Sequence, residues 1–184
     1  MADPLSPEAN VLGALALVLT DQMAARAATE AGESGARGAA LSALHHFLDA
    51  PSVDTLRRVL GLTHSGAVRL VDRLVSEGLV TRGPGGDGRS RAVTLTPAGR
   101  QAAARVSGAR STVLERALRN LSPDQRGTLH DLLGRLLAAV VEDKDGGAWI
   151  CRLCDLHACG RDEGRCPTAN AAAAKYGPPP PRGR

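Results

Sequence analysis

Four cysteines lie within sixteen residues in the last quarter of this 184-residue chain. Cys151, Cys154, Cys159 and Cys166 follow the spacing C-x2-C-x4-C-x6-C, and the sequence holds no other cysteine. Thiols inside cells are kept reduced, so a disulfide framework is disfavoured. Thiolates held this close repel one another unless a cation or a cluster neutralises them. The spacing therefore predicts a metal site or an iron–sulfur cluster with these four side chains as ligands.

The gaps between the cysteines favour iron over zinc. Structural zinc sites usually carry two C-x2-C elements, whereas this stretch has one. Its first two gaps match those of a zinc knuckle, but its last gap is longer. Compact cysteine runs that end in Cys-Pro are typical of iron–sulfur loops, and Pro167 follows Cys166 here. We expect a 4Fe–4S or 2Fe–2S cluster, with zinc as the alternative. Two alternatives to a metal site stay open, a thiol–disulfide switch and inert thiols. Within a metal site, His157 could replace one cysteine as a ligand.

The composition predicts a helical protein with an aliphatic core. Hydrophobic residues make up 43% of the chain, but Phe47, Trp149 and Tyr176 are its only aromatic residues. A core of Leu, Val and Ala favours packed helices. The longest apolar run, residues 11–19, falls short of the ~20 residues that span a bilayer. Because acidic residues also stand where a signal peptide carries positive charge, we expect a cytoplasmic protein without a membrane segment.

Basic residues are concentrated beyond the first fifty positions. Residues 1–50 hold two basic and six acidic side chains, whereas residues 51–100 hold eight arginines and four acids. The formal net charge of the whole chain is +4. An acidic start followed by a basic middle points to a polyanionic partner for the middle segment.

Two short helices and a hairpin are predicted in that basic middle. Ser52 caps the first helix, Thr63 caps the second, and the Gly61 turn between them completes a helix-turn-helix. A glycine-rich turn then joins two short strands. The expected bounds are 53–60 and 64–77 for the helices and 79–82 and 91–95 for the strands. This order predicts a winged helix, whose second helix and hairpin would face DNA.

Amphipathic helices flank this unit, so the predicted fold class is mainly α with one small β-hairpin. We expect these helices at residues 6–31, 39–49, 97–120 and 123–143, with a loop at 33–38. The predicted domain organisation is an N-terminal dimerisation helix and loop (1–38), a winged-helix domain (39–96), C-terminal dimerisation helices (97–148), a cysteine-rich loop (149–167) and a flexible tail (168–184).

Four short motifs in this order resemble the MarR family of bacterial regulators. They read LVDRL at 70–74, EGLV at 77–80, DGRSR at 87–91 and LTPAG at 95–99. The resemblance covers about residues 8–142. It implies a two-fold dimer held by the first and last helices, with each recognition helix in a major groove and each wing near a minor groove. It also implies a small-molecule effector between the dimer and DNA-binding parts. Val68 stands where the family often has a small polar residue.

The polar start of the second helix holds the residues that we expect to read DNA. In a helix-turn-helix this end of the recognition helix meets the base edges, which nominates Thr63, His64, Ser65 and Arg69. The planar fork of Arg69 suits a bidentate contact to guanine. Arg73, one turn further along, is expected to reach phosphate. The competing interpretations are that the polar residues serve only as caps and that Arg73 pairs with a nearby acid, Asp72 or Glu77.

The wing supplies a second set of candidate contacts. Arg82 is expected to reach phosphate, while Arg89 and Arg91 share one face of their strand because they lie two residues apart. The family resemblance suggests that Arg89 enters the minor groove and that Asp87 pairs with it or orients it. A solvated charged loop is the competing interpretation of this wing.

The functional prediction is a dimeric DNA-binding regulator on a pseudo-palindromic operator in double-stranded DNA, sensing redox state or iron through the four-cysteine cluster. The alternative is a winged-helix regulator with a structural or sensory zinc site that responds to a small ligand. An electron-transfer iron–sulfur protein and a winged helix used only for protein contacts are weaker alternatives. No G-x-S-x-G, phosphate loop or paired-carboxylate motif stands in the sequence, so we expect no enzyme.

Overall fold

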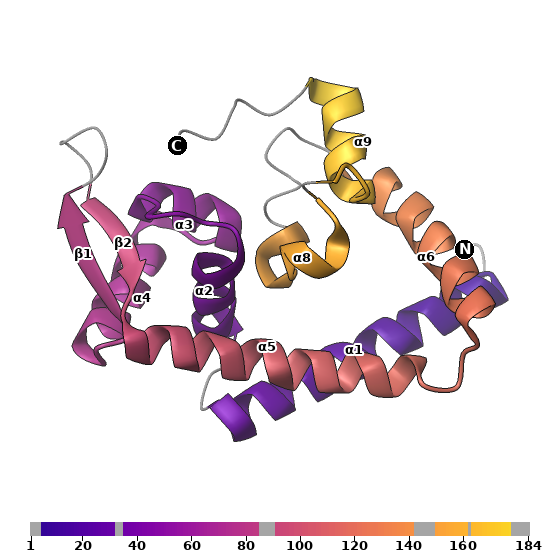
Figure 1. Ribbon diagram of the computed structural model, residues 1–184, viewed down its shortest axis with the longest axis horizontal. Helices are drawn as coiled ribbons and strands as arrows, with labels where there is room; N and C mark the ends of the chain where they lie inside the picture. Colours follow the sequence, from indigo (N-terminus) through magenta and orange to yellow (C-terminus); the bar gives the residue numbers. More distant parts are fainter. Residues whose placement is uncertain (1–4, 32–34, 85–90, 142–149, 162, 178–184) are drawn as a thin grey trace.

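The structure is a computed structural model that describes residues 5–31, 35–84, 91–141, 150–161 and 163–177. The elements follow in the order α1 (Pro7–Ala31), α2 (Gly35–His46), α3 (Val53–Leu60), α4 (His64–Ser76), β1 (Val80–Pro84), β2 (Arg91–Leu95), α5 (Pro97–Leu118), α6 (Pro123–Ala139), the 3-10 helix η1 (Cys151–Leu153), α8 (Leu156–Cys159) and α9 (Pro167–Tyr176). Figure 1 shows α2, α3, α4 and the hairpin at one end of α5, and α1 and α6 toward its other end. The fold is mainly α with one small hairpin, as expected.

The winged-helix lobe, residues 35–100, is built around α2. Leu41 of α2 packs with Leu56 of α3, Leu74 of α4 and Val93 of β2, and all four side chains are buried. The hairpin is antiparallel, with Val80 opposite Leu95. Because alternate residues of a strand face opposite sides, one face of the hairpin closes the aliphatic core while the other stays in solvent.

The predicted capping residues set the helix boundaries. The Ser52 and Thr63 hydroxyls accept hydrogen bonds from the third residue of α3 and α4, respectively. Gly61 adopts a left-handed φ of 64° in the turn between these helices, a conformation that favours glycine. Ser122 and Gln125 form a reciprocal capping box at the start of α6. These local hydrogen bonds explain why the helix starts could be predicted from the sequence.

Helix α5 begins in close contact with the hairpin. The Thr96 hydroxyl accepts the Gly99 N–H, and the Thr96 backbone N–H donates to the Leu79 carbonyl. A Cβ added at Gly99 would lie 1.9 Å from that carbonyl oxygen, so only glycine fits. This contact fixes where the long helix leaves the winged-helix lobe.

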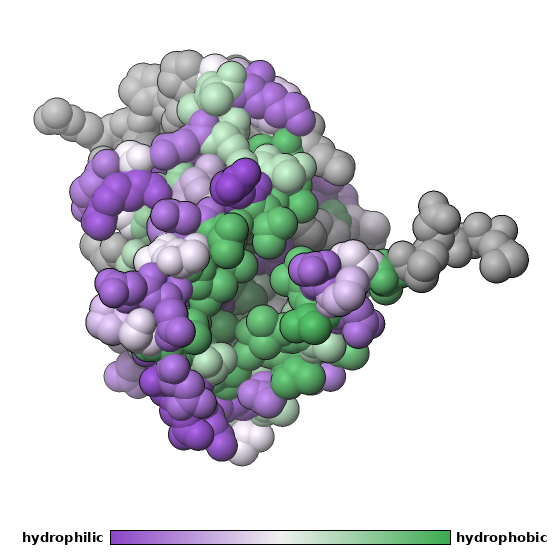
Figure 2. All heavy atoms as spheres, turned by 90° about the vertical axis from the view of Figure 1, so that its right-hand side faces the viewer, coloured by the Kyte–Doolittle hydropathy of each residue, from purple (hydrophilic) through white to green (hydrophobic). Residues whose placement is uncertain are grey.

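A large apolar surface lies over α1 and α6. Leu15 and Val18 of α1 and Leu132, Leu133 and Leu136 of α6 are all exposed large hydrophobic side chains. Figure 2, which faces this end of the molecule, shows a continuous hydrophobic region flanked by polar residues and hollowed near its centre. Solvated apolar surface of this extent marks an interaction site.

Part of α1, Pro7–Thr29, is long and apolar enough to cross a membrane by length and composition alone. The expectation of no such segment rested on the charged fraction and mean hydropathy of the whole chain and on the short uninterrupted apolar run. Interleaved alanines keep the mean hydropathy of the longer window high. One such helix near the N-terminus is weak evidence for a membrane segment, and in this structure α1 packs against α5.

Several sequence predictions differ from the structure, among them the end of the helix expected at 39–49, which lies at His46. The loop expected at 33–38 is shorter, because α2 already begins at Gly35 and Gly38 is buried within it. The last long helix ends at Ala139 rather than at 143. The tail expected to be flexible from residue 168 begins with α9. Proline at the first turn and an alanine run favour helix, so composition alone was the wrong guide there.

Candidate DNA interface and cysteine cluster

Helix α4 separates a buried face from a polar face. Ala67, Val71 and Leu74 are buried against the lobe, whereas His64, Ser65, Arg69 and Arg73 are exposed. Four of the residues predicted to contact DNA are therefore presented together on this helix. Thr63 is also exposed, but its hydroxyl accepts the Gly66 N–H at 3.1 Å and so serves as the cap.

The acids that were candidate partners for Arg73 are paired elsewhere. Asp72 Oδ1 lies 2.6 Å from Arg82 Nη1, and Glu77 pairs with Arg37 of α2. The structure gives Arg73 no ion pair with any residue in its described ranges. Neither acid therefore competes for its guanidinium, and the phosphate contact of Arg73 stays a prediction.

The wing is described only in part. Arg91 is exposed at the first position of β2, opposite Pro84 of β1. Asp87 and Arg89 lie outside the described residues. The half-buried side chain of Arg82 pairs with Asp72 and so joins the hairpin to α4, and its phosphate contact stays a prediction. This positioning role was not predicted from the sequence.

The first two cysteines form a pair within one tight turn. Cys151 opens η1, and the Cys154 N–H donates to the Cys151 carbonyl at 2.8 Å. The Cys151 thiol also forms a hydrogen bond with Cys154. The C-x2-C spacing therefore folds as one turn that places both sulfurs on the same side.

The last two cysteines form a second pair across a glycine turn. Cys159 and Cys166 are joined by a side-chain hydrogen bond. Between them, Gly160 and Gly164 adopt φ values of 61° and 69°, and the Arg165 N–H donates to the Gly160 carbonyl at 2.9 Å. Two left-handed glycines thus explain how a gap of six residues reverses the chain and brings the thiols together.

Positive charge surrounds the first thiol pair. The hydrogen bond from Cys151 lowers the pKa of Cys154 to about 6 against the raising effect of burial, and Arg110, Arg161 and Arg152 lower it further. The same hydrogen bond, together with burial, raises the pKa of Cys151. Burial and the proximity of Cys166 raise the pKa of Cys159. Cys154 is thus the thiol best prepared to be a thiolate at neutral pH.

The four sulfurs are neighbours but do not converge on one point. In the described part of the chain, no three His, Cys, Asp or Glu side chains are grouped so that they could hold a metal ion. The thiols form two hydrogen-bonded pairs, and charge interactions link Cys151 to Cys166 and Cys154 to Cys159. The donor set matches metals that prefer thiolates, and the metal site stays a prediction.

A histidine that no sequence motif distinguishes connects the cysteine segment to the lobe. His46, at the end of α2, has Nε2 2.8 Å from the Ser107 hydroxyl of α5 and Nδ1 3.8 Å from Asp155. Asp155 directly follows Cys154. No local sequence signal marks this contact, because its partners lie far apart in the chain.

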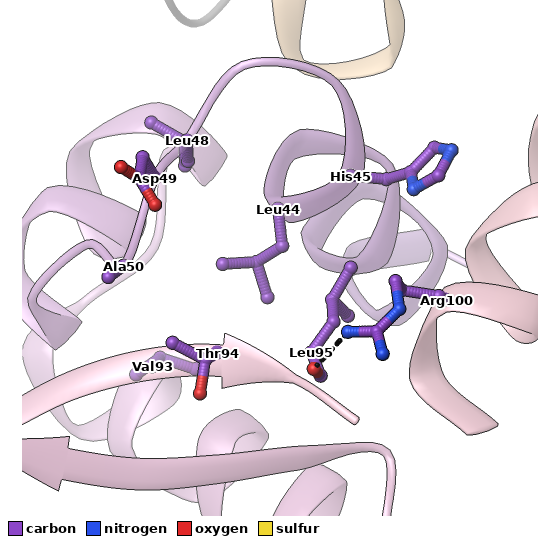
Figure 3. Close-up of a pocket in the computed structure, with 9 residues that line it drawn as sticks. All are labelled: Leu44, His45, Leu48, Asp49, Ala50, Val93, Thr94, Leu95 and Arg100. Atoms are coloured by element: carbon purple, nitrogen blue, oxygen red, sulfur yellow. Dashed lines mark hydrogen bonds between the residues drawn. The ribbon is translucent and has the colours of Figure 1, made fainter. Parts of the chain in front are cut away.

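Two surface depressions are candidates for small-molecule binding. One, of about 200 Å³, is shown in Figure 3, where the Arg100 guanidinium donates to the Leu95 carbonyl at 3.0 Å and His45 borders the opening. It is small, and both depressions are widely open to solvent. The other, of about 390 Å³, lies between α1 and α5 and is lined in part by Arg26, Thr112 and Arg116. Only the second reaches the size of about 300 Å³ or more that is usual for ligand sites.

Comparison with known proteins gives a consistent family. Residues 34–90 match the sequence model described as the MarR family. A search of curated proteins gives no match. A transcriptional regulator of the MarR family from Silicibacter pomeroyi is 29% identical, with 68% of this chain and 87% of that chain covered and a TM-score of 0.55.

Two further structures show how far the shared fold extends. The Mycobacterium tuberculosis MarR family protein Rv2887, in complex with salicylic acid, is 25% identical over 74% of this chain and 99% of its own, with a TM-score of 0.55. Apo MarR from E. coli is 21% identical over 73% of this chain and 99% of its own, with a TM-score of 0.59. These relatives are covered almost completely, whereas about a quarter of this chain lies outside the match. Residues 34–90 thus match the MarR family, and the fold of the chain is that of MarR-family transcriptional regulators.

Proposed function

We propose that this regulator binds, as a homodimer, a pseudo-palindromic operator in double-stranded DNA and that its four-cysteine segment reports redox state or iron supply. The observation that carries the DNA-binding part is the exposed polar face of α4, with Arg69 and Arg73 on it. Neither arginine has a described ion pair that would neutralise it. A basic helix face without neutralising partners is attracted to the phosphates that border a major groove. In winged-helix proteins this helix lies beside the wing and enters that groove.

The proposed contacts divide by chemistry. His64, Ser65 and Arg69 meet base edges, and Thr63 fixes the first turn that presents them. Arg73 and Arg91 contact phosphate, while Arg82 holds the hairpin against α4 through Asp72. Arg89, oriented by Asp87, reaches the minor groove in the arrangement that the family resemblance implies.

Dimerisation is proposed through the apolar surface of α1 and α6. This surface lies at the opposite end of the molecule from α4 and the hairpin, so a two-fold partner there leaves both recognition helices free (Figure 1). Homodimer interfaces are more apolar than ordinary surfaces, in keeping with the exposed leucines of α6. Two recognition helices related by this two-fold axis bind two half-sites about one helical turn of DNA apart.

The cysteine segment is proposed to hold an iron–sulfur cluster through Cys151, Cys154, Cys159 and Cys166, with zinc as the alternative. Four thiolates around either centre leave a net negative charge. Arg110 of α5, together with Arg152 and Arg161, supplies positive charge beside Cys154 to balance it. Loss or oxidation of the cluster would be the signal that changes operator affinity.

Two measurements on the same preparation test this function. Anaerobically purified protein is examined by ultraviolet–visible absorption, with iron, sulfide and zinc quantified. The same sample then selects duplexes from a random DNA pool, and binding is titrated at several salt concentrations. We expect stoichiometric iron and sulfide and a steep loss of affinity with salt. Absence of selected duplexes contradicts the DNA-binding part; a protein with neither iron nor zinc contradicts the four-cysteine part.

A small-molecule signal is the second candidate. The depression between α1 and α5 favours it, because Arg26 and Arg116 line a space large enough for a small carboxylate. The relative Rv2887 has been crystallised with salicylic acid. Salicylate titrated into the protein by calorimetry tests this candidate, with Arg116→Gln as the variant expected to weaken binding. Equal heats for wild type and variant would exclude the depression as the site.

A further inference from the structure

The cysteine segment has one anchor on the winged-helix lobe. The 3-10 helix η1 packs against α2, and Leu153 joins the partly buried residues that cover the hydrophobic core of the lobe. Asp155 adds a charged contact to His46 at the end of α2, and His46 in turn meets Ser107 of α5. Cys151, which is 2% exposed, and Cys154 lie on this anchored piece.

The segment has a separate anchor on the C-terminal long helix. Helix α9 packs against α6, with the Pro167 ring lying over Gly134, where an added Cβ would meet Pro167 Cβ at 3.3 Å. Lys175 of α9 donates to the Val141 carbonyl just beyond α6, at 3.0 Å. Cys166, which is 4% exposed, precedes Pro167 directly and so belongs to this second anchored piece together with its partner Cys159.

Each anchor therefore carries one thiol pair. Figure 1 shows α8 beside the winged-helix lobe and α9 on α6, with the two pieces meeting between them. Within either pair a hydrogen bond joins the sulfurs, and charge interactions connect one pair to the other. A centre that takes all four thiolates as ligands must draw the two pairs together.

We propose that the cysteine segment is a metal-dependent strut, in which one centre held by both thiol pairs ties the winged-helix lobe at α2 to α6. This inference rests on the proposed function, because it requires the four-cysteine site, and it adds where the site acts. Since α6 forms part of the proposed dimer surface, the strut sets the position of each recognition helix relative to the partner subunit. The metal would then control the spacing of the two recognition helices. Operator affinity depends on this spacing, because both helices must match the distance between the half-sites.

The experiment compares metal-loaded and metal-free forms of the full chain. The metal-free protein is prepared with a chelator under reducing conditions and then loaded either with zinc chloride or anaerobically with ferrous iron and sulfide. Metal content is measured first. Amide hydrogen exchange of α2 and α9 and affinity for a selected duplex are then measured in both forms. We expect loading to slow exchange in both helices and to change duplex affinity about tenfold, as is typical of coupled sites.

Two variants keep all four cysteines and weaken one anchor. Leu153→Ala removes the side chain that packs on the core of the lobe, and Asp155→Asn removes the charge facing His46 without touching the core. We expect both to bind the metal stoichiometrically, to keep the protection of α9, and to lose the protection of α2 and most of the tenfold response. Arg119→Ala, at the far end of α5, is the matched control and is expected to behave as wild type.

The outcomes separate the metal site from the strut. If neither iron nor zinc binds to the wild type, the four-cysteine site fails and the strut fails with it. If metal binds but exchange in α2 is unchanged, the site stands and the strut is wrong. If Asp155→Asn and Leu153→Ala both keep the full affinity response, the contact with the lobe does not transmit the signal and the strut is likewise overturned.

Discussion

Arg82 of β1 and Asp72 of α4 form an ion pair with their nearest charged atoms 2.6 Å apart, which joins the wing to the recognition helix. Both side chains are partly exposed, so the pair contributes under about 1 kcal/mol to folding. We expect its main effect to be on the position of the hairpin relative to α4, because it connects these two elements directly. Arg82, which the sequence predicts to contact phosphate, therefore has a second possible role in positioning the hairpin against α4.

A double-mutant cycle tests that role. If Arg82 acts through Asp72, then Arg82→Gln, Asp72→Asn and the double variant all weaken duplex binding to a similar extent. A direct phosphate contact would instead confine the loss to Arg82→Gln and lower the salt slope by about 1. Glu77→Gln, which removes a charge at the end of the same helix without touching Arg82, controls for the change in net charge.

Arg69 is the strongest candidate for reading a base. Arg69→Ala is expected to cost about 1–3 kcal/mol of affinity for the selected duplex and to relax sequence preference at one position of each half-site. Arg119→Ala removes the same charge from the far end of α5 and should change neither. A uniform loss across all duplexes, with sequence preference kept, would assign Arg69 to phosphate instead.

The apolar surface of α1 and α6 is expected to hold the dimer together. Leu133→Glu places a charge in that surface, where it would be desolvated without a partner, so we expect light scattering to report monomers at concentrations where the wild type is dimeric. Val75→Glu alters an exposed apolar residue outside this surface and should leave the mass unchanged. Equal masses for all three proteins would refute the assignment.

Thiol reactivity in the reduced, metal-free protein should follow the local charges. Because the pKa of Cys154 is lowered to about 6, its thiolate predominates above that pH and is lost as the pH falls through it. Iodoacetamide at a pH of about 7 should therefore alkylate Cys154 first. Cys151 should react slowly, because it is buried and its pKa is raised. Peptide mass spectrometry measures both rates. Arg110→Gln should slow the alkylation of Cys154, because Arg110 stabilises its thiolate. An unchanged alkylation rate would exclude this role for Arg110.

The contact at the start of α5 predicts a large stability effect. An added Cβ at Gly99 would collide with the Leu79 carbonyl, so Gly99→Ala should destabilise the fold by about 2–4 kcal/mol in urea unfolding. Gly108→Ala, in the interior of the same helix with nothing within 4 Å of the new Cβ, should stabilise by up to about 1 kcal/mol. Similar midpoints for the two variants would contradict the close approach.

The sequence was most informative where structure is local. Ser52 and Thr63 were predicted as caps, and each accepts the backbone N–H that a cap must satisfy. It was least informative where partners meet through the fold. Neither the Arg82–Asp72 pair nor the contact of His46 with Asp155 has a spacing that marks it.

The cysteines lie between these two cases. Their number and spacing indicated one four-cysteine site, and the C-x2-C turn and the glycine turn each follow from local conformational preferences. That each pair would be anchored to a different part of the molecule could not be predicted. It depends on Leu153 reaching the core of the lobe and on Pro167 meeting Gly134.

The division of the apolar surface between α1 and α6 has a consequence for the order of events during synthesis. The core of the winged-helix lobe joins elements from α2 to the first turns of α5, so we expect it to form once these residues have emerged. Helix α6 follows the lobe in the chain, so a nascent subunit presents only half of the surface that a partner would recognise. Pairing of subunits then waits until the lobe has already formed, which keeps incomplete chains from capturing one another.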